Sequence, residues 1–122
     1  MALPEHLKTG LRGEQLAARY LREKKYTILA ANYSTKLGET DIIALTKDEK
    51  TICFVEVKTR SPGQMLSPSE AVDAGKEARL RTNAAAYMKR VKADSLNIRF
   101  DIIEVLLHDL FTADINHIEN AF

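Results

Sequence analysis

Two acids, and then an acid and a lysine, fall within two segments of residues 38–60 that otherwise have the composition of buried strands. Glu39 and Asp41 lead into the apolar residues of the first strand, and Glu56 and Lys58 interrupt the apolar run of the second. Burying an unpaired charge costs on the order of several kcal/mol. The sequence therefore indicates that these charges have a use, and the leading hypothesis is that they bind a metal ion.

Alternation along the two strands predicts where these side chains meet. Successive side chains of a strand point to opposite faces of a sheet. If the hairpin closes through a two-residue turn at residues 48–49, Asp41 stands opposite Glu56 and Glu39 stands opposite Lys58. Like charges that face each other across neighbouring strands repel. The two acids are therefore expected to converge at the open end of the hairpin and to require a cation.

Oxygen ligands of this kind are typical of Mg²⁺ or Mn²⁺, which keep several water ligands and accept phosphate oxygens. Lys58 could neutralise developing negative charge or orient a water nucleophile. Glu14 borders the apolar face of an expected helix and could supply a third carboxylate. Two alternatives stay open: Glu14 could be a first-turn acid favoured by the helix dipole, and Glu39 could form a cross-strand salt bridge with Lys58.

The order of predicted elements favours a single α/β domain over residues 1–122. Ser67 and Glu70 have the spacing of a capping box with Pro68 at the first helical position, so a helix is expected from there to about residue 92, with a break at Gly75. A helical crossover allows the following strand to pair parallel, which predicts a mixed four- or five-stranded sheet flanked by helices. The periodicity predicts a helix over 12–24, strands over 26–34, 39–46, 51–58 and 98–107, a loop over 60–70 and a short strand over 115–120.

Composition restricts the class of protein. With 122 residues, 45% hydrophobic and 29% charged, the chain has the size and balance of one globular domain, and no apolar run approaches the roughly 20 residues of a membrane span. We expect no membrane partner. The first ten residues lack the features of a secretory signal. The single cysteine, Cys53, is expected to be a small buried hydrophobe, which favours a cytoplasmic location.

Basic residues gather in one part of the nearly neutral chain, between residues 76 and 92. Lys76 and Arg79 lie there, and Arg60 follows the acids and lysine of the hairpin. These three are candidate contacts to nucleic-acid phosphates, although a solvated helix face explains the same pattern. Asp101 and Glu104 in the predicted fourth strand are expected at a strand end or facing solvent. The chain's histidines, His6, His108 and His117, lack metal-ligand spacing and are expected at the surface or at strand ends.

The arrangement of these residues resembles the PD-(D/E)XK nuclease superfamily. The segments "GEQLAARYL", "GETDIIA", "FVEVKTR", "EAVDAGKEARL", "RFDIIEV" and "HIENAF" further resemble the YraN-type family of uncharacterised bacterial proteins over nearly the whole chain. The resemblance implies a restriction-endonuclease-like fold of the order αβββαβ. The arrangement of the helix glutamate, the aspartate and the E-x-K residues is also similar to that of archaeal-type Holliday junction resolvases, whose chains are of comparable length.

The resemblance also implies roles for individual residues. Asp41 and Glu56 match the metal-binding acids of the superfamily, the backbone carbonyl of Val57 its additional ligand, Lys58 its catalytic lysine and Glu14 its helix acid. The chain departs from the pattern in one place. The sequence "GETD", residues 38–41, stands where a Pro-Asp pair is usual, so its glutamate at position 39 is an extra acid that could join the catalytic set, support it or pair with the lysine.

The leading hypothesis is a metal-dependent endonuclease that hydrolyses DNA phosphodiester bonds in branched or recombination and repair intermediates, with Mg²⁺ or Mn²⁺ as cofactor. The alternative is a non-catalytic nucleic-acid-binding accessory module of the same fold. A third hypothesis is a protein-interaction scaffold unrelated to nucleic acid. A junction resolvase cuts two symmetric strands and would need a two-fold homodimer.

Overall fold

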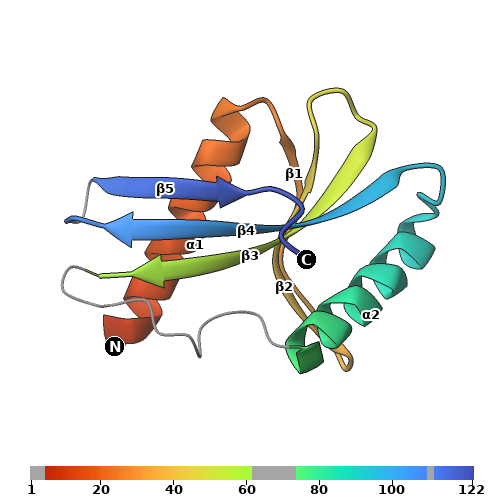
Figure 1. Cartoon of the computed structure of the whole chain (residues 1–122), viewed down its shortest axis with the longest axis horizontal. Coiled ribbons are helices and arrows are strands. Elements are labelled where there is room, and N and C mark those ends of the chain that lie inside the picture. The colour runs from red at the N-terminus through yellow and green to blue at the C-terminus, as the bar shows by residue number, and fades with distance from the viewer. Residues whose placement is uncertain (1–4, 62–73, 110–111) are drawn as a thin grey trace.

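A five-stranded sheet lies between two helices in the computed structural model, which describes residues 5–61, 74–109 and 112–122 (Figure 1). This confirms the predicted α/β class with a mixed sheet. The elements are α1 (Glu5–Glu23), β1 (Thr27–Thr35), β2 (Gly38–Leu45), β3 (Thr51–Arg60), α2 (Ala74–Val91), β4 (Asn97–Leu107) and β5 (Ala113–Ile118).

The strands follow one another across the sheet in chain order, β1-β2-β3-β4-β5. All neighbouring pairs are antiparallel except β3 and β4, which run parallel over ten residue pairs. The helical crossover predicted from the sequence is thus confirmed. Between β2 and β3 the predicted register is also confirmed over residues 42–45, since Ile42 pairs with Val55 and Leu45 pairs with Ile52.

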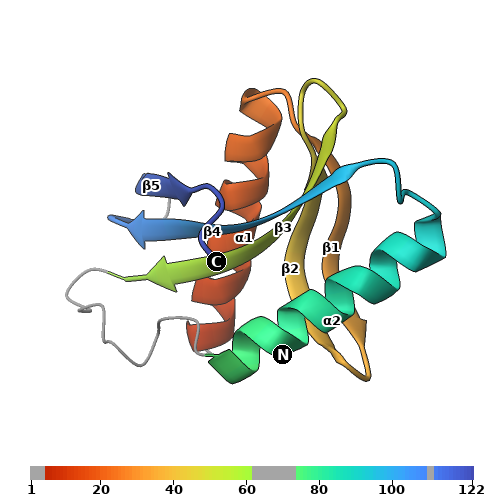
Figure 2. The ribbon, with the colours of Figure 1, turned by 45° about the vertical axis from the view of Figure 1, so that its right-hand side comes forward.

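The helix α1 is longer than predicted because it begins at Glu5 rather than near residue 12. Gly10 and Gly13 both lie inside the helix. Ala17 and Leu21 are fully buried against the sheet together with apolar residues of β2, β3 and β4. Figure 2 shows α1 behind the sheet and α2 crossing in front of it, so each helix covers one face.

On the opposite face, α2 runs without a break from Ala74 through Gly75 to Val91. The predicted capping box at Ser67 and Glu70, and most of the predicted loop, lie in 62–73, outside the described residues. Asn83 anchors the helix, because its side-chain amide donates to Thr40 Oγ1 at 3.1 Å while its oxygen accepts from Thr35 Oγ1 at 2.6 Å. Asn83 lies in α2, Thr35 in β1 and Thr40 in β2, so these hydrogen bonds fix the helix over the first two strands.

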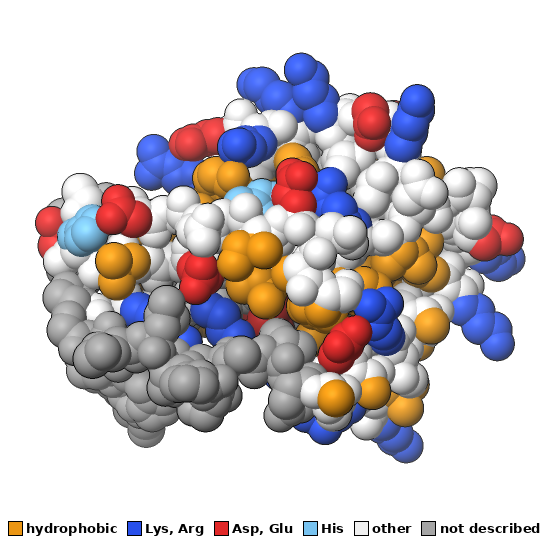
Figure 3. All heavy atoms as spheres, viewed as in Figure 1, with side chains coloured by type: hydrophobic (Ala, Val, Ile, Leu, Met, Phe, Trp, Pro, Cys, Tyr) orange, Lys and Arg blue, Asp and Glu red, His pale blue; other side chains and the backbone are white. Residues whose placement is uncertain are grey.

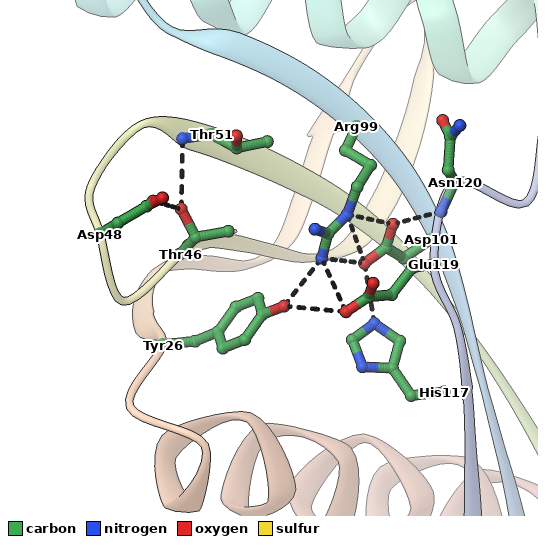
Figure 4. Close-up of polar contacts among 9 residues, drawn as sticks. All are labelled: Tyr26, Thr46, Asp48, Thr51, Arg99, Asp101, His117, Glu119 and Asn120. Carbon is green, nitrogen blue, oxygen red and sulfur yellow. Dashed lines mark hydrogen bonds and ion pairs between the residues drawn. The ribbon is translucent and has the colours of Figure 1, made fainter.

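Asp101 corrects the expectation that it lies at a strand end or faces solvent. Asp101 is fully buried, and its carboxylate accepts hydrogen bonds from Arg99 Nε at 2.9 Å and from the Asn120 N–H at 3.0 Å (Figure 4). His117, whose side chain is 5% exposed, contacts the same carboxylate at 2.7 Å. Arg99 also donates to the Tyr26 hydroxyl at 2.8 Å. This buried polar cluster links the connection between α1 and β1 to β4, β5 and the C-terminal residues.

Cys53 has the buried position expected for it: it is fully buried in the core beneath α1. Burial, followed by the nearby Asp101 charge, raises the pKa of its thiol to about 12. The thiol is therefore a packing group at neutral pH. Neither described helix is both long enough and apolar enough to cross a membrane.

Candidate active site

Two cavities open beside the C-terminal half of β3. The first, of about 350 Å³, lies between α1 and the ends of β2 and β3, and its lining includes Glu14, Asp41, Glu56 and Val57. The second, of about 400 Å³, lies on the α2 side. Its lining residues are Gly38, Glu39, Asp41, Glu56, Lys76, Arg79 and Leu80. Asp41 and Glu56 border both cavities, so the predicted acid pair stands at the centre of this region.

Asp41 lies one residue beyond the last paired position of the β2–β3 ladder. Its Oδ2 accepts a hydrogen bond from the Val57 N–H at 2.8 Å, so the side chain takes the place of a backbone partner. Burial raises the pKa of Asp41 to about 7, and the negative charge of Glu56 adds to this effect. The hydrogen bond from Val57 opposes both causes without cancelling them. At neutral pH the metal-free site therefore holds only part of the negative charge that its two acids could carry.

Glu56 is 8% exposed and interacts with two lysines. Lys76 Nζ lies 2.5 Å from Glu56 Oε1, and Lys58 Nζ lies 3.4 Å from the same oxygen. Burial lowers the pKa of Lys58, and its contact with Lys76 lowers it further. Burial is the largest single influence on Lys76 and lowers its pKa. The contacts with Glu56 and Lys58, together with the negative charges of Glu56 and Asp41, outweigh burial and raise the pKa. The charge of Glu56 is thus compensated mainly by Lys76.

Glu14 reaches the first cavity because α1 packs very closely on β3 at the preceding residue. A Cβ atom at Gly13 would lie 1.8 Å from Thr59 Oγ1, so only glycine fits there without displacing the helix or the strand. Burial raises the pKa of Glu14, and the charges of Glu39 and Glu56 contribute in the same direction. Glu14 therefore belongs to the acidic site electrostatically as well as spatially.

Replacing Gly13 with alanine is expected to lower the free energy of unfolding by about 1–3 kcal/mol, because the added methyl overpacks the contact with Thr59. Gly10→Ala is the matched control, since a Cβ atom at Gly10 would meet no atom within 4 Å. That change should raise stability by up to about 1 kcal/mol through helix propensity. Urea unfolding of both variants measures this difference, and shifts of the same sign would contradict the packing argument.

The remaining predicted residues divide between the cavities. Glu39 is exposed at the rim of the second cavity, and no ion pair within the described residues joins it to Lys58; the structure pairs Lys58 with Glu56 instead. Arg79 lines the same cavity. Arg60 donates to the Thr59 carbonyl oxygen at 2.8 Å and borders a different cavity, which it shares with Lys58.

The basic residues do not form one continuous patch on the face drawn in Figure 3, where Lys and Arg side chains alternate with acidic and apolar ones. The contact between Lys76 of α2 and Glu56 was not foreseen from the sequence, which suggested only that Lys76 contacts a phosphate or orients a water molecule. A signal was present: Lys76 shares a helix face with the buried Leu80 and Asn83.

The donor set fits a hard divalent cation. Asp41 and Glu56 supply carboxylate oxygens in a partly buried position where their charges oppose each other, and such a site accepts Mg²⁺ or Mn²⁺ with water completing the coordination. Within residues 5–61, 74–109 and 112–122, no group of three or more acidic, histidine or cysteine side chains is arranged to hold a metal ion. The candidate site therefore rests on two acids, with Glu14 on the wall of the cavity.

A mixed five-stranded sheet between two helices, with paired acids and a lysine at the ends of β2 and β3, has the architecture of the restriction-endonuclease-like fold class. Residues 13–105 match the uncharacterised protein family UPF0102. A UPF0102 protein of Alkaliphilus oremlandii is 51% identical over 117 residues, covering 94% of this chain and 97% of that relative. Relatives from Syntrophomonas wolfei (45% identical, covering 93% and 96%) and Caldanaerobacter subterraneus (46%, covering 90% and 90%) are similar along comparable lengths. The chain belongs to the UPF0102 family, which confirms the resemblance to YraN-type proteins.

Proposed function

We propose that this protein is a metal-dependent endonuclease that hydrolyses DNA phosphodiester bonds, on branched or recombination and repair intermediates. The observation that carries the proposal is the position of Asp41 and Glu56, which border both cavities and oppose each other's charge. An acid pair of this kind is costly in a protein that has no cation to place between its members.

The roles follow from the positions of the side chains. Asp41 and Glu56 would hold Mg²⁺ or Mn²⁺, with the carbonyl of Val57 as the further ligand that the family resemblance implies. When bound, such an ion lowers the pKa of a coordinated water and stabilises charge on phosphoryl oxygens. Lys58, beside Glu56 and 18% exposed, is placed to stabilise negative charge on the phosphate. Glu14 adds a third acid to the wall of the first cavity.

Positive charge around the acids supports DNA as the substrate. Lys76 and Arg79 line the second cavity, and Arg60 lies just beyond Lys58 on the same strand. Lysine and arginine contacts to phosphates supply most of the sequence-independent affinity for DNA. The acids between them would weaken that affinity unless a cation intervened.

The experiment is cleavage of labelled four-way junction, flap, nicked duplex, single-stranded DNA and RNA in Mg²⁺ and in Mn²⁺. We expect the wild-type protein to cut at least one DNA substrate and Asp41→Ala to abolish cutting, because the variant removes half of the acid pair. Glu23→Gln is the control, since Glu23 is an exposed acid at the far end of α1. The absence of metal-dependent cutting by the wild type would contradict the proposal.

One observation favours a second candidate, a nucleic-acid-binding accessory module without metal chemistry. Glu56 is already compensated by the ammonium groups of Lys76 and Lys58. Such a module would bind the same DNA panel equally well in chelator and in Mg²⁺. Binding that persists in chelator, together with no cutting, would establish this candidate in place of the nuclease.

A further inference from the structure

Lys76 differs from the neighbouring basic residues of α2 in the helix face on which it lies. Lys76, Leu80, Asn83 and Tyr87 follow one another at intervals of four, three and four residues, which places them on one side of the helix. Leu80, Asn83 and Tyr87 are buried against the sheet, whereas Arg79 is exposed. The contacts that dock the helix therefore also direct Lys76 toward β3.

The ammonium of Lys76 contacts the carboxylate oxygen with which Glu56 could otherwise bind a metal ion. Lys76 Nζ lies 2.5 Å from Glu56 Oε1, and the two side chains are 33% and 10% exposed. A hydrogen bond between two charged groups is stronger than one between neutral groups. Lys58 Nζ approaches the same oxygen less closely, at 3.4 Å. One carboxylate oxygen therefore serves two ammonium groups in the metal-free protein.

We propose that Lys76 is a built-in counter-ion for Glu56, and that a divalent cation binds at Asp41 and Glu56 by displacing the Lys76 ammonium. This inference rests on the proposed function, because it takes Glu56 as a metal ligand. The oxygen that holds a close ammonium cannot at the same time present its lone pairs fully to a cation. Lys76 is thus a positioning residue: it keeps Glu56 in place and lowers the affinity of the empty site for metal.

Displacement also gives Lys76 a second position. Lys76 and Arg79 both line the cavity on the α2 side, which also contains Glu39 at its rim. An ammonium released from Glu56 would remain in that cavity, beside the guanidinium of Arg79. Two cations there suit a phosphate of the DNA backbone, so metal binding and DNA binding at this site are expected to support each other.

A calorimetric titration with Mn²⁺ alone tests directly whether the cation competes with the Lys76 ammonium for Glu56. Lys76→Met should bind Mn²⁺ about tenfold more tightly than the wild type, because the cation no longer has to break a charged hydrogen bond. Lys89→Met is the matched control, since it removes the same charge from an exposed residue at the other end of α2. Its affinity should stay within about twofold of the wild type.

The outcomes separate this inference from the proposed function. Equal or weaker Mn²⁺ binding by Lys76→Met, with clear binding by the wild type, would overturn the counter-ion role and leave the metal site standing. No Mn²⁺ binding by either protein would overturn the metal site, and the inference with it. Mn²⁺ binding by Lys76→Met alone would support the counter-ion role in its strongest form.

A second measurement follows the ammonium itself. In the metal-free protein the side-chain NMR signal of Lys76, assigned by its loss in Lys76→Met, should differ from that of a solvated lysine such as Lys89. Addition of Mg²⁺ should shift the Lys76 signal while leaving the Lys89 signal in place. A Lys76 signal that stays unchanged when Mg²⁺ saturates the site would show that the ammonium is not displaced. A residue with only a structural role would give that unchanged signal.

Discussion

Replacing Asp101 with alanine is expected to lower the free energy of unfolding by about 3–5 kcal/mol, the range found when one partner of a buried ion pair is removed. The carboxylate is fully buried and holds Arg99 through both oxygens, at 2.9 Å from Nε and 2.9 Å from Nη2. It also holds His117 at 2.7 Å and the Asn120 N–H at 3.0 Å. Its loss leaves several polar groups without a partner. Urea unfolding at pH 7 measures the change.

Asp114→Ala provides the control for this prediction. Asp114 also contacts a histidine, His108, at 2.8 Å, but the two side chains are 76% and 49% exposed. Exposed pairs contribute at most about 1 kcal/mol, so Asp114→Ala should change stability little. If the free energy of unfolding falls by similar amounts in the two variants, the buried polar cluster does not stabilise the fold as we expect.

The pH dependence of the cluster follows from the direction of the Asp101 shift. Burial alone would raise the pKa of Asp101, but the hydrogen bonds from His117, Arg99 and Asn120 outweigh it and lower the pKa. A lowered pKa in the folded protein means that the ionised carboxylate favours folding. This stabilisation is therefore present above the ordinary pKa of an aspartate and is lost as the pH falls through the lower, folded-state value.

Asp41→Asn is expected to act in the opposite direction and to stabilise the metal-free protein at pH 8 by on the order of 2–4 kcal/mol. The pKa of Asp41 is raised from 3.8 to about 7, by burial first and by Glu56 second. The folded protein thus binds this proton more tightly than the unfolded chain does. Ionisation consequently costs stability as the pH rises from about 4 to about 7, and asparagine avoids that cost while keeping an acceptor for the Val57 N–H.

The measurement is thermal or urea unfolding of the wild type and Asp41→Asn in chelator, at intervals from pH 4 to pH 8. The difference between the two proteins should grow across that range and then level off. Addition of Mg²⁺ should reduce the difference, because the cation stabilises the ionised acid. Glu39→Gln, at an exposed position on the same strand, should show no such trend. If Asp41→Asn is no more stable than the wild type at pH 8, ionisation of Asp41 beside Glu56 does not destabilise the fold, and the prediction is wrong.

The register of the β2–β3 hairpin could be predicted from the sequence because turn chemistry fixes it locally. Asp48 Oδ1 accepts a hydrogen bond from Thr46 Oγ1 at 2.7 Å (Figure 4). It also accepts one from the Lys50 N–H at 3.0 Å, and Glu49 has a positive φ of 60°. A turn of this length leaves one pairing for the strands that follow it. The convergence of Asp41 and Glu56 therefore followed from residues close to them in the chain.

The contacts that could not be predicted join distant parts of the chain. The carboxylate of Asp101 is paired by Arg99 in β4, His117 in β5 and the Asn120 N–H beyond β5. A strand acid next to apolar residues is predicted to be exposed unless such partners are known. One pattern could have indicated the burial of Asp101: Arg99, Asp101 and the buried Ile103 and Val105 share one face of β4 by alternation. The helical spacing of Lys76 with Leu80 and Asn83 indicates that Lys76 faces the sheet. It does not indicate that Glu56 is the side chain it meets, because that depends on where α2 lies over the sheet.

The parallel ladder between β3 and β4 has a consequence for the order in which the site assembles during folding. β1, β2 and β3 close through short turns, whereas β4 returns only after residues 61–96, and pairing over such a separation is slow because the loop entropy is lost first. All the acids of the site belong to the early half of the chain, and Lys76 belongs to the crossover. The nascent hairpin therefore gathers its negative charge before Lys76 can pair with Glu56, and in that interval Lys58 and cations from the solvent compensate this charge.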